Sequence, residues 1–315
     1  MKRLLLFLPL AGLALAGTEV ELKTETGVLH GTLEEAAKPD KSVVVLILPG
    51  SGPTDRDGNS AGLPGKNNCL KQLAEVLTAK GISSLRIDKR GIAASAAAGP
   101  KEEDLRFETY IDDAEAWIDF LEKDKGFKKT VVLGHSEGAL IGLVAAEKKD
   151  VAGYISLAGT SRRAGPLLRA QLKSKLTPAL LGEATVVMQL LDQGEQVEKI
   201  SPELNVLFRP SVQPYLISWF KYTPTEEIGN LKAPALILQG STDIQVLPAD
   251  AEALHAAQPD STLEIIDGMN HVLKAVSSDE KAQLDSYSNP KLELHPGLVG
   301  PIEKFVREQA KAGSP

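Results

Sequence analysis

Cysteine and histidine are scarce in this 315-residue chain, which holds one Cys, Cys69, and five His. A single cysteine excludes an intramolecular disulfide, and neither residue type recurs at the spacing of a metal-ligand cluster. We therefore expect no metal and no other cofactor. Cys69 is interpreted as a small buried apolar residue and not as a nucleophile. A chain of this length without disulfides must be held together by its hydrophobic core.

Positive charge is also in short supply, with 35 Lys and Arg against 42 Asp and Glu, a formal net charge of −7. An acidic chain without a basic run does not attract polyanions, so nucleic acid is not an expected partner. Hydrophobic residues make up 43% and charged residues 24% of the chain, as in an ordinary globular protein. This composition excludes collagen, coiled coils and disordered chains.

The N-terminus reads as a signal peptide. Lys2 and Arg3 supply its basic region, and the apolar run 4–15 is too short to span a bilayer comfortably. Ala14 and Ala16 are the small residues at −3 and −1, so cleavage is predicted after Ala16. The alternative is a retained interfacial anchor; a lipoprotein anchor is not expected, because no Cys follows the run. We predict a secreted or periplasmic protein without stable membrane insertion after cleavage.

Apolar periodicity predicts an α/β fold. Residues 19–34 alternate as an antiparallel hairpin does, and 43–48 is a continuous apolar run typical of a strand buried on both faces. Strands are then predicted at 82–87, 130–133, 151–157, 235–238 and 262–266, and helices at 67–80, 107–121, 137–148, 248–257 and 297–310. Alternating strands and helices favour a mostly parallel sheet flanked by helices.

This alternation stops between residues 161 and 229. The segment is too long for a plain connection, is rich in proline and has helical apolar spacing of its own. Because the strand pattern resumes afterwards, we interpret 161–229 as a helical cap inserted into one core domain. That core comprises residues 17–160 and 230–315.

A candidate nucleophile lies at the turn from the strand 130–133 to the helix 137–148. The sequence Gly134-His135-Ser136-Glu137-Gly138 matches G-x-S-x-G there, and such a turn pushes the serine hydroxyl out of the sheet. The alternative is a serine that merely caps the helix. A serine hydroxyl is a poor nucleophile without a base, so a histidine and a carboxylate should follow on strand-end loops.

The predicted base is His271, five residues after the strand that ends at Ile266 and within a Gly-Met-Asn-His turn. His295, before the last helix, is the alternative. The remaining histidines are less suitable because they lie in the hairpin, beside the nucleophile or on a packed helix: His30, His135 and His255. Since the base must be neutral, activity is expected to rise with pH through the range in which histidines titrate.

The predicted acid is Asp243, which follows the strand 235–238 and precedes His271 by 28 residues. One helix and one strand fit in that interval, so both residues should emerge at the same sheet edge. A carboxylate there would fix the imidazole tautomer and stabilise the imidazolium. Asp267 is the alternative acid, and an Asx turn or a helix cap is the structural alternative for Asp243.

Acyl transfer also requires N–H donors for an oxyanion. We predict the backbone N–H of Glu137, directly after the nucleophile, and that of Ser51 in the loop 49–53, Pro-Gly-Ser-Gly-Pro. A phosphate-binding loop is excluded because no Lys-Ser/Thr pair ends it and Pro53 lacks a donor. The charged residues of 54–59 either line the mouth of the site or form a hydrogen-bonded structural loop.

Together these segments resemble α/β hydrolases of the EstD type of bacterial carboxylesterase, which are related to the S33-like serine aminopeptidase hydrolases. The matching pieces are 49–59 (PGSGPTDRDGN), 86–91 (RIDKRG), 134–138 (GHSEG), 240–243 (GSTD) and 270–271 (NH). The sequence departs from the family pattern at 92–98, where an alanine-rich run replaces an expected glycine and serine. The resemblance implies the α/β-hydrolase fold, the three triad roles and hydrolysis of small carboxylic esters.

Three other functions stay open. An S33-like aminopeptidase would need acidic residues in the cap to pair with a free substrate amine. The cap offers four such residues, which on helices are more often a solvated face: Glu183, Glu195, Glu198 and Glu203. An acyltransferase with an acceptor other than water is possible on the same site. A non-catalytic binding protein is less expected, because the triad is intact in the sequence.

Overall fold

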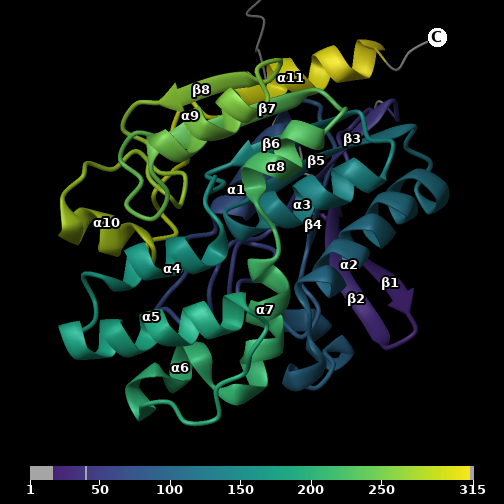
Figure 1. The fold of residues 1–315 in the computed structure, drawn as a ribbon. Coiled ribbons are helices and arrows are strands. Elements are labelled where there is room, and N and C mark those ends of the chain that lie inside the picture. The colour runs from purple at the N-terminus through teal and green to yellow at the C-terminus, as the bar shows by residue number, and fades with distance from the viewer. Residues whose placement is uncertain (1–16, 40, 313–315) are drawn as a thin grey trace, which may run out of the picture.

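The computed structural model describes residues 17–39 and 41–312, so the predicted signal peptide, 1–16, lies outside the described residues. Its centre is one eight-stranded sheet in the order β1-β2-β4-β3-β5-β6-β7-β8 (Figure 1). Strand β1 (Thr18–Thr24) pairs with β2 (Gly27–Glu34) as an antiparallel hairpin, and β2 also pairs antiparallel with β4 (Ser84–Ile87).

The other pairs are parallel. They join β3 (Val43–Leu48), β5 (Lys129–His135), β6 (Gly153–Leu157), β7 (Ala235–Gly240) and β8 (Thr262–Ile266), and β4 also pairs parallel with β3. Because β3 is buried on both faces, every side chain in it is apolar. The predicted fold class, a mostly parallel sheet with flanking helices, is confirmed.

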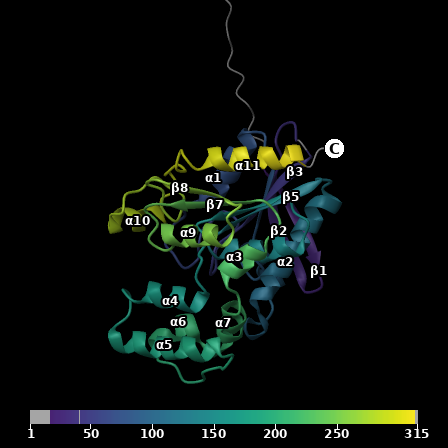
Figure 2. The same ribbon diagram turned by 45° about the horizontal axis from the view of Figure 1, so that its top comes forward.

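Helices cover both faces of the sheet (Figures 1 and 2). On one face lie α1 (Cys69–Ala79) and α11 (Val299–Ala312), packed on alternate side chains of β3 such as Val45 and Ile47. On the other lie α2 (Phe107–Asp119), α3 (Glu137–Lys148), α8 (Pro224–Asn230) and α9 (Pro248–Ala257), over Leu46 and Leu48. The two cores hold the strand ends, and therefore the loops that follow them, in fixed positions.

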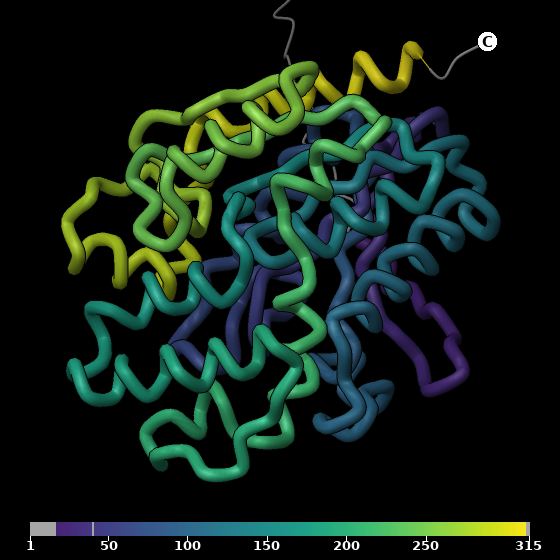
Figure 3. Tube along the Cα trace, in the orientation of Figure 1, coloured from purple at the N-terminus to yellow at the C-terminus, as the bar shows by residue number. Residues whose placement is uncertain are grey.

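The chain leaves the sheet after β6 and returns at β7 (Figure 3). Between them, α4 (Ala164–Leu172), α5 (Pro178–Asp192), α6 (Asn205–Phe208) and α7 (Gln213–Phe220) gather at one end of the molecule (Figure 2). These helices lie within the segment 161–229 predicted as a cap. The helix that follows, α8, packs instead on α3 and α9 of the sheet layer.

Aromatic packing docks the cap on α2. The ring of Phe107 stacks on that of Trp219 with centroids 5.9 Å apart, and Tyr215 and Tyr222 pack beside it. The backbone N–H of Phe107 donates to Ser218 Oγ at 2.7 Å. Each buried ring removes on the order of 150–250 Å² of surface from water, so this cluster fixes α7 against the core.

The remaining helical segments are short. Helix α10 (Glu280–Ser286) follows the loop after β8, and a π-helical turn (Phe120–Asp124) continues α2. Four segments of residues 17–39 and 41–312 are 3₁₀-helical: Ala93–Ala98, Glu102–Asp104, Pro202–Leu204 and Pro210–Val212. In the described residues, none of the helices has both the length and the apolar character needed to cross a bilayer.

Candidate active site

Ser136 lies at a strained turn between β5 and α3. Its backbone has φ 56° and ψ −121°, a conformation that L side chains rarely adopt and that points to an imposed geometry. Two glycines allow the turn: a Cβ on Gly134 would lie 2.1 Å from the carbonyl oxygen of Gly138, and one on Gly138 would lie 2.5 Å from that of Pro49. The half-buried Ser136 side chain thus emerges at the carboxyl end of the sheet.

His271 reaches the hydroxyl of Ser136 from the loop after β8. Its Nε2 lies 3.1 Å from Ser136 Oγ, within hydrogen-bond distance, and the residue is only 4% exposed. Asn270 anchors the loop, because its Nδ2 donates to Ser286 Oγ at 2.8 Å and its Oδ1 accepts from the Lys274 N–H at 2.9 Å. The loop that carries His271 is therefore held in place by buried hydrogen bonds.

Asp243 completes the arrangement from the loop after β7. Its Oδ2 lies 2.7 Å from His271 Nδ1, and its Oδ1 accepts the backbone N–H groups of Gln245 and Val246 at 2.7 and 3.0 Å. Burial raises the pKa of Asp243, but the nearby His271 and these hydrogen bonds outweigh burial, so the pKa lies below its ordinary value. The carboxylate thus stays ionised and can orient the imidazole.

The alternative candidates lie apart from this group. Asp267 is exposed, and its Oδ1 accepts from Ser241 Oγ at 2.8 Å. His295 is held by local bonds: its N–H donates to the Leu273 carbonyl at 2.8 Å, and its Nδ1 accepts the N–H of Gly297. Of the candidates for base and acid, the structure brings together His271 and Asp243 with Ser136.

His135 has a position that sequence reasoning missed. Its ring centroid is 5.0 Å from that of His271, and its Nε2 lies 2.8 Å from the backbone carbonyl oxygen of His271. Burial, and then the charge of His271, lower the pKa of His135 to about 4. It is therefore neutral near pH 7, and its Nε2–H donates to the loop that carries the base. The G-x-S-x-G match marks this residue only as a variable position.

The two predicted oxyanion donors are the backbone N–H groups of Glu137 and Ser51. The Glu137 N–H is the first of α3, so it has no acceptor within that helix. The backbone of Gly50 lies against the nucleophile, since a Cβ there would be 3.2 Å from the Cβ of Ser136. The next residue, Ser51, is exposed at the mouth of the site. The predicted donor Glu137 therefore follows Ser136 directly, and the predicted donor Ser51 follows a glycine whose backbone borders Ser136.

The charged loop 54–59 is a structural support. Arg56 is buried, and its guanidinium makes two hydrogen bonds to Asp88 Oδ2, at 3.0 and 2.8 Å. The Arg56 backbone N–H donates to Asp88 Oδ1, and Asp55 Oδ1 accepts the N–H groups of Asp57 and Asn59. Of the two interpretations of this loop, the contacts favour the hydrogen-bonded structural one.

We next consider Cys69 and the side chains that could ligate a metal ion. Cys69 is fully buried in α1, and burial raises the pKa of its thiol to about 12, so the thiol stays protonated and inert. Within the described residues, His, Cys, Asp and Glu do not gather into a group that could hold a metal ion.

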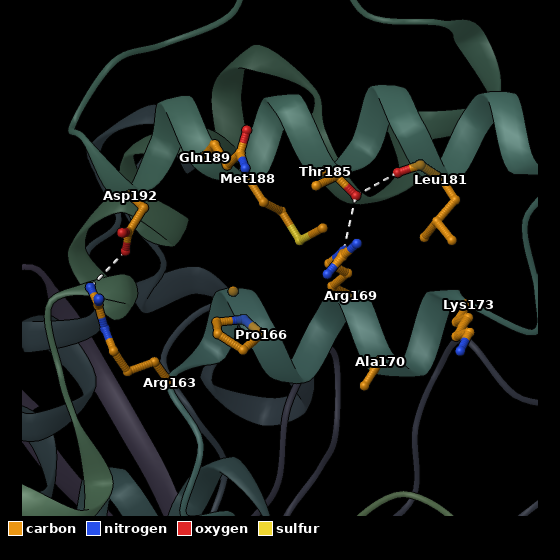
Figure 4. Close-up of a pocket in the computed structure, with 11 residues that line it drawn as sticks. Arg163, Pro166, Arg169, Ala170, Lys173, Leu181, Thr185, Met188, Gln189 and Asp192 are labelled. Carbon is orange, nitrogen blue, oxygen red and sulfur yellow. Dashed lines mark hydrogen bonds and ion pairs between the residues drawn. The ribbon is translucent and has the colours of Figure 1, made fainter.

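The cap carries a groove of its own, of about 540 Å³, between α4 and α5 (Figure 4). Pro166, Leu181 and Met188 provide apolar walls, and Arg163 pairs with Asp192 at one end at 2.6 Å. None of the residues that line it belongs to the site around Ser136. The groove is therefore a feature separate from that site.

A nucleophile turn between β5 and α3, with a histidine and an aspartate after later strands of the same sheet, defines the α/β-hydrolase fold. The chain belongs to the serine aminopeptidase S33 family, whose model matches residues 61–275. The resemblance expected from the sequence motifs is thereby confirmed.

Several known proteins are similar to this chain in sequence or in fold. Esterase EstD of Thermotoga maritima is 27% identical over 232 residues, which are 73% of this chain and 54% of that protein, so the chain spans about half the length of this relative. Est1E of Butyrivibrio proteoclasticus, solved with ferulic acid, superposes with a TM-score of 0.60 at 18% identity over 93% of this chain and 99% of its own. A proline iminopeptidase of Mycobacterium smegmatis superposes at 0.59 with 12% identity, over 94% and 100%. Both structural likenesses show the fold.

Proposed function

We propose that this protein is a serine hydrolase that cleaves small carboxylic esters through an acyl intermediate on Ser136. The observation that carries the proposal is the continuous chain of contacts from Ser136 Oγ to His271 Nε2, 3.1 Å, and from His271 Nδ1 to Asp243 Oδ2, 2.7 Å. A non-catalytic binding protein would not need these three groups aligned at a strained backbone.

In the proposed mechanism, Ser136 Oγ attacks the ester carbonyl carbon as its proton passes to His271 Nε2. The tetrahedral oxyanion accepts hydrogen bonds from the N–H groups of Ser51 and Glu137. His271 then returns the proton to the departing alkoxide, which leaves as an alcohol. Water, activated by the same imidazole, releases the carboxylic acid, and Asp243 remains ionised throughout. These steps require no metal or organic cofactor.

The cap favours an ester over an aminoacyl substrate. An aminopeptidase needs a carboxylate that faces the free amine of its substrate. Of the four cap carboxylates considered, Glu183 already accepts from Ser201, through its N–H at 2.7 Å and its Oγ at 2.5 Å. The other three, Glu195, Glu198 and Glu203, are exposed to solvent. EstD, whose sequence match covers 73% of this chain, is an esterase by name. This similarity also favours an ester substrate over an aminoacyl one.

The test uses the wild-type protein with a fluorophosphonate probe and a pair of substrates. We expect the probe to label the wild type and Ser136→Ala to abolish labelling, while Ser288→Ala, at an exposed serine, labels normally. A p-nitrophenyl ester of a short acid should be hydrolysed at least tenfold faster than an aminoacyl arylamide. Labelling that persists in Ser136→Ala would refute the nucleophile, and the reverse substrate preference would refute the ester assignment.

We also propose that the protein is exported and acts in the periplasm or outside the cell. The support is the residue pattern of 1–16 described above. Expression of the full chain in a bacterial host should yield a protein whose first residue is Gly17, as read by N-terminal sequencing. Ala16→Leu places a large residue at −1 and should block this cleavage. A wild-type protein that keeps Met1 would contradict the proposal.

A further inference from the structure

We propose that Lys89 is a positioning residue that fixes the Gly50–Ser51 peptide so that the Ser51 N–H faces the oxyanion. The inference rests on the proposed function and adds a group that the triad does not include. Lys89 follows β4, within the segment 86–91 that matches the family pattern but was assigned no role in the sequence analysis.

The Lys89 ammonium lies behind the site. The residue is only 5% exposed, and its Nζ donates to the Gly50 carbonyl oxygen at 2.6 Å. Its charge is compensated by Glu137, whose Oε1 lies 3.4 Å away, and by the ring of Tyr110, whose centroid is 5.3 Å away. A buried ammonium is costly unless it is paired, so these partners offset the cost of burying Lys89 and hold it in place.

The contact determines which way the next N–H points. In the described residues every peptide bond is trans, and in a trans peptide the C=O and the following N–H point in opposite directions. Because the Gly50 carbonyl points inward to buried Lys89, the N–H of Ser51 must point away from it. Gly50 lies against Ser136, and in the proposed arrangement the outward-facing N–H lies on the side on which Ser136 reacts.

The loop needs such a restraint because glycine would let this peptide rotate. Gly50 carries no Cβ, and Gly52 has φ 66°, so the chain around Ser51 has few steric limits of its own. A rotated peptide would present a carbonyl oxygen to the developing oxyanion and would repel it. An ammonium that binds the carbonyl selects the productive orientation before the substrate arrives, as electrostatic preorganisation requires.

The ion pair between Lys89 and Glu137 connects the two predicted oxyanion donors, the N–H groups of Ser51 and Glu137. Glu137, which holds the charge of Lys89, also supplies the second predicted N–H of the oxyanion hole. Tyr215 of α7 also interacts with Glu137; burial, and then the charge of Glu137, raise the pKa of its phenol well above the ordinary value, so it stays protonated. Lys89 is thus enclosed by protein and acts through Gly50 without touching the substrate.

The test combines ester kinetics with binding of a trifluoromethyl ketone, which adds to the serine and forms a stable oxyanion. Lys89→Met should lower kcat about 10²-fold, the effect of losing one oxyanion donor, with little change in KM. Affinity for the ketone should fall by the same factor. The matched control is Arg86→Met, which removes a buried cation that pairs with Glu34 and contacts neither Gly50 nor Glu137; it should destabilise the fold but keep kcat and ketone affinity.

Lys89→Arg addresses the possibility that the neutral variant does not fold. The guanidinium keeps the charge beside Glu137 but is larger and planar, so its N–H groups cannot occupy the position of the ammonium. We expect kcat and ketone affinity to fall together, about tenfold. A folded Lys89 variant with wild-type kcat, or one that loses kcat while it binds the ketone normally, would overturn the inference.

The test of Lys89 can be distinguished from the test of the proposed function. Fluorophosphonate labelling of the wild type, and its loss in Ser136→Ala, test the nucleophile without reference to Lys89. If the wild type is labelled and the Lys89 variants behave as the wild type does, the inference alone is wrong. If the wild type is neither labelled nor active on esters, the proposed function is wrong and the inference is lost with it.

Discussion

The imidazole of His135 packs against that of His271, with ring centroids 5.0 Å apart and His135 Nε2 2.8 Å from the carbonyl oxygen of His271. One histidine thus holds the backbone of the other. The supporting histidine must be neutral to do so without repelling the imidazolium that forms on His271 during the proposed reaction. Its low pKa is therefore tied to the chemistry of the site and has consequences for stability.

His135 should make the fold sensitive to acid. Its pKa falls from 6.5 in the unfolded chain to about 4 in the folded protein, through burial first and the charge of His271 second. A lowered pKa contributes stability that is fully present above pH 6.5 and is lost as pH falls toward 4. We expect this group alone to lower the free energy of unfolding by about 3 kcal/mol over that interval. Urea unfolding between pH 4 and 7 measures it.

His135→Gln is the control for this pH effect. Glutamine keeps an N–H donor near the position of Nε2 but does not titrate. Its stability curve should be flatter than that of the wild type by most of the stated amount. Parallel curves for the two proteins would show that His135 is not the group responsible.

Asp243→Asn should nearly abolish ester hydrolysis. The amide cannot accept the His271 Nδ1–H in the same way, so the imidazole loses its reactive tautomer, and a loss of about 10⁴-fold in kcat is typical of this change. Asp267→Asn makes the same substitution at an exposed carboxylate and should keep full activity. Steady-state kinetics on a p-nitrophenyl ester compare them; equal losses in the two variants would contradict the role of Asp243.

Gly138→Ala should damage both stability and activity. Its Cβ would lie 2.5 Å from the Pro49 carbonyl oxygen and 2.6 Å from that of Leu48, so α3 would have to move away from the loop after β3. We expect a loss of roughly 3 kcal/mol, as for other overpacked sites, together with a lower kcat. Gly182→Ala, in open space on α5, should instead stabilise the protein by about 0.5–1 kcal/mol. Thermal melts of the two variants test the contrast.

A pair of carboxyl groups between α3 and α8 should weaken the fold as pH rises from 4.5 to about 7. Burial, and then the charge of Glu227, raise the pKa of Glu147 to about 7. A raised pKa contributes stability at low pH that is lost as pH rises through 7. Because Glu147 is half exposed, we expect Glu147→Gln to stabilise the protein by only about 1 kcal/mol at pH 8, and by less at pH 5.

Thermal unfolding at these two pH values measures the effect of Glu147→Gln. The control is Glu252→Gln, which removes an exposed carboxylate from α9 and should leave the melting temperature unchanged at both. Equal shifts for the two variants would mean that net charge, and not the pair with Glu227, is responsible.

The sequence predicted Ser136, Asp243 and His271 as one group because each lies in the turn or loop after a recognisable strand. Parallel strands end at one edge of a sheet, so local pattern and topology together bring the three loops into proximity. Lys89 and His135 could not be found in this way. Their partners, Gly50 and His271, lie 39 and 136 residues away, and the local pattern gives no sign of either contact.

The bounds of helices and strands could be predicted where nearby residues determine them, whereas the strand order could not. Strand 262–266 and helix 137–148 are as predicted, because turn residues bound them. Helix α1 begins at Cys69 and not at residue 67, because Asn67 Oδ1 accepts the Cys69 N–H and Asn68 has φ 52°. The strand order, with β4 between β2 and β3, depends on pairing between distant segments, which periodicity does not specify.

The cap divides the sheet into two stretches of chain, with Ser136 before it and both Asp243 and His271 after it. Neither stretch alone holds all three groups of the proposed triad, and α11 at the far end packs on β3 of the first stretch. Turnover is therefore a readout of complete folding. Under the proposed function, a polypeptide still being synthesised, or one truncated before β8, would lack His271 and would hydrolyse no ester.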